Sequence, residues 1–111
     1  VAVPPFPYSS GDNESVVFGS RVYLLPRDIQ ERHIHLEEMS FDPTSGQFYI
    51  SDNRGYVLYI TAVSPTITET QGLILERLSH TYMPKAMFRN DIGSKFEKQG
   101  HDQLKSWGYL L

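Results

Sequence analysis

Residues 33–63 read HIHLEEMSFDPTSGQFYISDNRGYVLYITAV, and this stretch decides the fold. It contains three apolar runs of alternating side chains, which two turn sequences separate. Residues 42–46 and 51–55 both offer polar side chains that can bond the nearby backbone, and both end in a glycine that accepts positive φ. Because successive side chains of a strand point to opposite faces, the three runs are typical of strands. The stretch therefore predicts a three-stranded antiparallel meander.

The first strand of this meander changes phase. Ile34 and Leu36 alternate in one frame, whereas Met39 and Phe41 lie in the other. A β-bulge at residues 37–38 would reconcile the two frames, because one extra residue re-aims all later side chains. Alternatively, Met39 and Phe41 line the less buried face of a regular strand.

Further elements are expected on both sides of the meander. Residues 16–25, VVFGSRVYLL, form a β-rich run that Pro26 ends. Apolar residues at helical spacing predict a helix over residues 69–80 and another over residues 85–99. Residues 101–107 suit one more short helix.

Particular apolar side chains carry these helix predictions. Phe88, Ile92 and Phe96 recur at steps of four residues, which places them on one helical face. In the last helix we expect Leu104 and Trp107 to point inward.

Strands first and helices afterwards indicate an α+β fold. We expect an antiparallel sheet of about four strands, followed by two or three short C-terminal helices packed on one face. Residues 1–14 carry several prolines and predict an extended arm, and residues 15–111 predict a single α+β domain.

Composition excludes several classes of function. The chain has 111 residues without a cysteine, which excludes disulfides and thiolate metal sites. A net charge of −3 makes nucleic acid an unexpected partner. Because no apolar run reaches the length that spans a bilayer, we expect a soluble protein without a transmembrane segment. The glycosylation triplet at residues 13–15 does not decide the compartment.

His33, His35 and Glu37 form the candidate metal site. Side chains two residues apart on a strand point the same way, so two imidazoles and a carboxylate share one face. Two histidines and a carboxylate are a known ligand set for a divalent metal. Alternatively, Ile34 and Leu36 face the core, and the three polar side chains face water.

No P-loop, dinucleotide-binding glycine pattern or nucleophile elbow is present, which disfavours an enzyme without deciding the question. The sequence favours a non-enzymatic interaction or assembly module that binds a protein partner or a second copy of itself. The alternatives are a small metal- or histidine-dependent enzyme and a small-molecule-binding domain. The expected partner-binding residues lie near the two ends of the chain, at Pro4, Pro5, Phe6, Tyr8, Trp107 and Tyr109.

Overall fold

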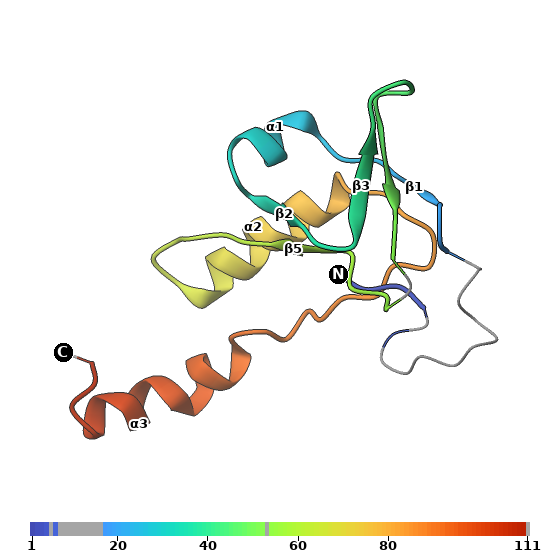
Figure 1. The fold of residues 1–111 in the computed structure, drawn as a ribbon. Coiled ribbons are helices and arrows are strands. Elements are labelled where there is room, and N and C mark those ends of the chain that lie inside the picture. The colour runs from blue at the N-terminus through green and yellow to red at the C-terminus, as the bar shows by residue number, and fades with distance from the viewer. Residues whose placement is uncertain (5, 7–16, 53, 111) are drawn as a thin grey trace.

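The computed structural model describes residues 1–4, 6, 17–52 and 54–110. The described part of the first half contains the strands and one short helix, and the second half contains the other helices (Figure 1). In chain order the elements are β1 (Arg21–Val22), α1 (Pro26–Gln30), β2 (Ile34–Leu36), β3 (Met39–Asp42), β4 (Gln47–Ile50), β5 (Leu58–Ile60), α2 (Ile67–Ser79), the π-helical turn η1 (Phe96–Gly100) and α3 (His101–Ser106). The fold is α+β, as the sequence predicted.

The strands form two antiparallel sheets. One sheet has the order β1-β4-β3, and the other pairs β2 with β5. The hairpin of β3 and β4 confirms the first half of the predicted meander, with Phe41 opposite Phe48. The expectation of one continuous sheet was wrong, because β5 pairs with β2 instead of β4.

The sheets separate at residues 37–38, where the sequence pattern changes phase. The Glu37 amide donates to the carbonyl of Val57 at 2.9 Å. Because Val57 immediately precedes β5, backbone pairing with this segment continues up to Glu37. The Glu38 carboxylate then accepts hydrogen bonds from the amides of Gly55 at 2.9 Å and Tyr56 at 3.2 Å. Instead of a bulge within one ladder, the strand therefore leaves one sheet and enters the other.

The turn between β3 and β4 has the predicted chemistry. The Asp42 carboxylate accepts from the Thr44 amide at 2.9 Å and from the Ser45 hydroxyl at 2.7 Å. Gly46 has a φ of +70° and donates its amide to the Asp42 carbonyl at 2.8 Å. These hydrogen bonds hold the hairpin closed, and those from the Ser45 hydroxyl and the Thr44 amide to the carboxylate lower the pKa of Asp42.

The described residues at the start of the chain form part of the core. Most of the arm predicted over residues 1–14 lies outside the described residues, and its extent stays a prediction. The backbone amide and carbonyl of Ala2 are both hydrogen-bonded to the backbone of Met87, and Val3 is completely buried. The Val3 amide donates to the carbonyl of Gly55 at 2.9 Å. The core cluster consists of Val3, Val17, Val22, Ile34, Ile50, Val57, Leu58 and Met83.

Of the predicted helices, α2 and α3 are confirmed. The helix predicted over residues 85–99 is only partly present, because residues 85–93 are not helical and helical backbone begins at Ser94, just before η1. Two backbone features prevent it: Lys85 has a φ of +56° directly after Pro84, and Gly93 has a φ of +91°. None of the described helices is long and apolar enough to cross a membrane.

The helices do not all pack on one face of the sheet, which corrects the prediction. α2 lies against the β2–β5 sheet, whereas η1 and α3 project away from both sheets (Figure 1). Trp107, which we expected to point inward, is 61% exposed. The radius of gyration is 16.8 Å, compared with about 13 Å for a compact domain of this length.

Candidate protein-interaction site

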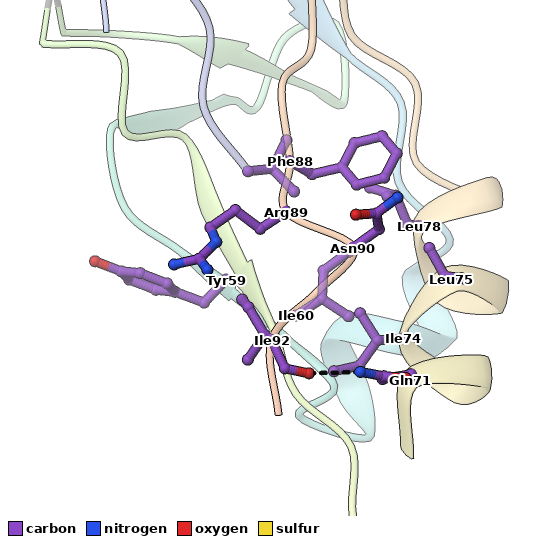
Figure 2. Close-up of a pocket in the computed structure, with 11 residues that line it drawn as sticks. Tyr59, Ile60, Gln71, Ile74, Leu75, Leu78, Phe88, Arg89, Asn90 and Ile92 are labelled. Atoms are coloured by element: carbon purple, nitrogen blue, oxygen red, sulfur yellow. Dashed lines mark hydrogen bonds between the residues drawn. The ribbon is translucent and has the colours of Figure 1, made fainter. Parts of the chain in front are cut away.

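An apolar groove of about 190 Å³ lies between β5 and α2. Figure 2 shows β5 on one side, α2 on the other, and residues 88–92 running between them. The groove-lining residues of α2 are three and four positions apart, a spacing that places side chains on the same face of a helix. They are Gln71, Ile74, Leu75 and Leu78.

The groove opens to the surface through apolar side chains. Tyr59 and Phe88 are 49% and 53% exposed, and Leu75 and Ile92 are 44% and 63% exposed. Isolated apolar residues at a surface need no explanation, but these four line one depression and come from three segments of the chain. The groove is therefore a mainly apolar surface, with polar side chains at Gln71, Arg89 and Asn90.

One polar pair stands at the rim of the groove. Arg89 donates two hydrogen bonds of 2.9 Å to the carboxylate of Asp91. These hydrogen bonds lower the pKa of Asp91 and raise the pKa of Arg89. Because the two charges neutralise each other, the pair gives the groove no net charge with which to select an ionic ligand.

Next to the groove begins a projecting segment, residues 94–110, which we call the arm. It contains η1 and α3 and ends in a helix cap at Gly108, whose φ is +80°. The amide of Tyr109 donates to Leu104 at 3.0 Å and that of Gly108 to Lys105 at 3.0 Å, the two bonds of a Schellman motif. This cap fixes the direction in which Tyr109 leaves the helix.

The arm carries aromatic side chains into solvent. Phe96 is 36% exposed, Trp107 is 61% exposed and Tyr109 is 76% exposed. Phe96 makes an edge contact with His101 within the arm, at 5.8 Å between ring centroids. Large aromatic side chains dominate the energy of protein interfaces, which makes the arm a candidate interaction surface.

Side chains of α2 fasten the base of the arm. Gln71 donates to the Ile92 carbonyl at 2.8 Å (Figure 2) and to the Ser94 hydroxyl at 3.2 Å. The Thr68 hydroxyl donates to the Glu97 carboxylate at 2.9 Å. The arm is thus held pointing away from the groove of its own chain.

The predicted metal residues lie on and beside β2. His35 is exposed and shares a hydrogen bond of 3.1 Å with Thr61. His33 lies 3.7 Å from Asp28 and 3.5 Å from Glu31. Among the described residues, no three histidine, aspartate or glutamate side chains are grouped as metal ligands. Metal binding by His33, His35 and Glu37 stays a prediction, which metal analysis of purified protein with His35→Ala as control would test.

A second, charged cavity of about 120 Å³ lies between α1 and α2. Asp28 lines it and is only 2% exposed, and its Oδ2 atom has no hydrogen-bond partner among the described residues. A buried carboxylate without such a partner is costly. Basic side chains share the cavity with it, at Arg27, His33, Arg77 and His80.

The six predicted partner-binding residues have different positions. Phe6 packs edge-on against Tyr56 of its own chain, at 4.7 Å between ring centroids. Pro4 is half-buried, and Pro5 and Tyr8 lie outside the described residues. Only Trp107 and Tyr109 are placed in the open, on the arm.

The groove was not predicted, because the spacing of Phe88 and Ile92 favours a helix over this segment. The turn-forming residues between them, Asn90 and Asp91, together with Gly93, were the signal that this segment is not helical. Comparison of the chain with protein-family models, curated proteins and solved structures finds no match. The groove and the arm are therefore interpreted from their own geometry.

Proposed function

We propose that this protein is a non-enzymatic assembly module that binds a protein surface through its arm. The observation that carries the proposal is the exposure of Trp107 and Tyr109 on a helical segment that projects from the domain. Exposing such side chains to water is unfavourable, and burying them in a partner recovers that free energy.

A small-molecule-binding function is the second candidate, and the groove favours it. Apolar walls with a few polar groups at the rim are typical of ligand pockets. The volume of about 190 Å³ is below the range of roughly 300–1,000 Å³ that holds drug-sized ligands. Because the groove is also open along its length, it suits a row of protein side chains better than an enclosed ligand.

Retention of binding partners tests the assembly function. The tagged wild-type chain and a tagged Trp107→Ser/Tyr109→Ser variant are incubated with extract of cells that also express the untagged chain. We expect the wild-type chain to retain at least one polypeptide, identified by mass spectrometry, that the variant loses. Val63→Ser is the matched control, because Val63 is apolar and 94% exposed but lies outside the arm. Equal retention by all three chains would show that the arm is not a binding surface.

A further inference from the structure

We infer that the partner of the arm is a second copy of this chain, and that two copies exchange arms so that each arm fills the groove of the other. This inference rests on the proposed function and names its partner. The same chain carries an aromatic arm that nothing in the described part of the chain covers and an apolar groove that stands open. A helix laid into an apolar groove is a common way for proteins to recognise each other.

The arm cannot reach its own groove in the observed arrangement. The backbone turns away at Gly93, which lies against Ile67: a Cβ atom added to this glycine would be 2.8 Å from the Ile67 Cγ2 atom. Gln71 and Thr68 then hold the next residues to α2 through hydrogen bonds. Since these contacts fix the base of the arm, the occupant that we infer for the groove is the arm of another molecule.

The position of the arm favours a closed pair of molecules. Ile92 lines the groove and the arm begins two residues later, so the two surfaces are adjacent. The 11 residues of η1 and α3 extend about 16 Å as a helix. When each arm crosses to the neighbouring groove, both contacts form around one two-fold axis, and the assembly closes as a dimer.

The apolar area agrees with what a stable dimer requires. The exposed fractions of Phe96, Trp107 and Tyr109 correspond to about 350 Å² of arm surface, at roughly 200 Å² for each exposed aromatic side chain. The exposed side chains of the groove offer about the same area on that scale. Two contacts would thus bury about 1,400 Å², within the range of roughly 1,200–2,000 Å² that specific interfaces bury.

Sedimentation velocity over a range of concentrations measures the association directly. We expect a species of twice the 12.7 kDa chain mass that dissociates on dilution and forms no larger assemblies. Trp107 is the only tryptophan in the chain, so its emission should shift to longer wavelength on dilution as the arm is released into water. A monomer at every concentration, or a series of growing oligomers, would overturn the exchange.

Paired variants test which surfaces meet. Trp107→Ser alters the arm and Leu75→Glu the groove, and both side chains are exposed enough to leave the fold intact, which circular dichroism checks. We expect each variant alone to be monomeric and Val63→Ser to dimerise like the wild type. A mixture of the two variants should form a weaker 1:1 complex, because one intact arm then meets one intact groove.

The outcomes separate this inference from the proposed function. If either single variant still dimerises, or if the mixture stays monomeric, arm exchange is wrong. If the chain alone is monomeric but retains a different polypeptide through its arm, the assembly function stands and the second copy is wrong. If the arm retains neither a second copy of the chain nor another polypeptide, arm exchange and the assembly function are both wrong.

Discussion

At Gly55 the backbone has a φ of +89° and lies directly beneath the first residues of the chain. A Cβ atom at this position would be 2.3 Å from the Val3 carbonyl oxygen and 2.8 Å from the Phe6 Cβ atom. The glycine is needed for two separate reasons, its backbone conformation and the close approach of another segment.

We therefore expect Gly55→Ala to lower the free energy of unfolding by about 2–4 kcal/mol, measured by urea denaturation. Gly46→Ala is the matched control. Gly46 also has positive φ, at +70°, but no atom lies within 4 Å of an added Cβ. Gly46→Ala should lower the free energy of unfolding by only about 1–2 kcal/mol, which is the cost of positive φ for a residue with a Cβ atom. Equal losses at the two glycines would contradict the close packing of the chain start on Gly55.

Asp42 provides a pH-dependent contribution to the hairpin. Hydrogen bonds from the Ser45 hydroxyl and the Thr44 amide lower the pKa of Asp42 from its ordinary value of 3.8. A lowered folded-state pKa means that the stabilisation is present above the unfolded-state pKa and is lost as the pH falls through the folded-state pKa. An NMR titration should place the Asp42 pKa below 3.8, and Ser45→Ala should raise it. An unchanged pKa in that variant would show that the Ser45 hydrogen bond is absent in solution.

At the scale of elements, α2 supports both the groove and the arm. Its N-cap is Thr66, whose hydroxyl accepts from the Glu69 amide at 3.1 Å. The side of α2 that faces β5 carries the groove residues, and its first turns hold the base of the arm through Thr68 and Gln71. Substitutions at the start of this helix should therefore distinguish residues that stabilise the fold from residues that only hold the arm in place.

Thr66→Ala should lower the free energy of unfolding by about 1 kcal/mol, because it removes an N-cap. Thr68→Ala should change that free energy by less than about 0.5 kcal/mol, because its hydroxyl is bonded to Glu97 of the arm and not to the backbone of α2. Chemical denaturation of the two variants measures both changes in the free energy of unfolding. A larger loss at Thr68 would mean that the arm contributes to the stability of the domain.

For the whole molecule, stability depends on a core that joins distant parts of the chain. The completely buried residues Val3, Ile50 and Val57 come from the chain start, β4 and the segment before β5. The arm contributes nothing to this core cluster. The core cluster thus belongs to the domain, and contact with a partner is the role that we propose for the arm.

Val3→Ala should lower the free energy of unfolding by about 2 kcal/mol, since it removes two buried methyl groups and leaves a cavity. Val63→Ala makes the same chemical change at a side chain that is 94% exposed, and should stay within about 0.5 kcal/mol of the wild type. Thermal denaturation of both variants provides the comparison. A stable Val3→Ala variant would show that the chain start is not part of the core in solution.

The sequence by itself determined the local features of this protein. The turn at residues 42–46, the β3–β4 hairpin, α2 and α3 all follow from side-chain periodicity and from residues that bond the backbone near them. Even the break at residues 37–38 was marked by a change of phase. These features are predictable because neighbouring residues decide them.

Only the tertiary structure decided which surfaces meet. Periodicity does not state that β5 pairs with β2, that Val3 packs on Gly55, or that Trp107 points into solvent. Phe88 and Ile92 have helical spacing, yet the pairing of Ala2 with Met87 and the packing of Gly93 on Ile67 hold their segment irregular. Contacts between residues far apart in the chain outweigh local preference, because burial recovers more free energy than a weak helix propensity provides.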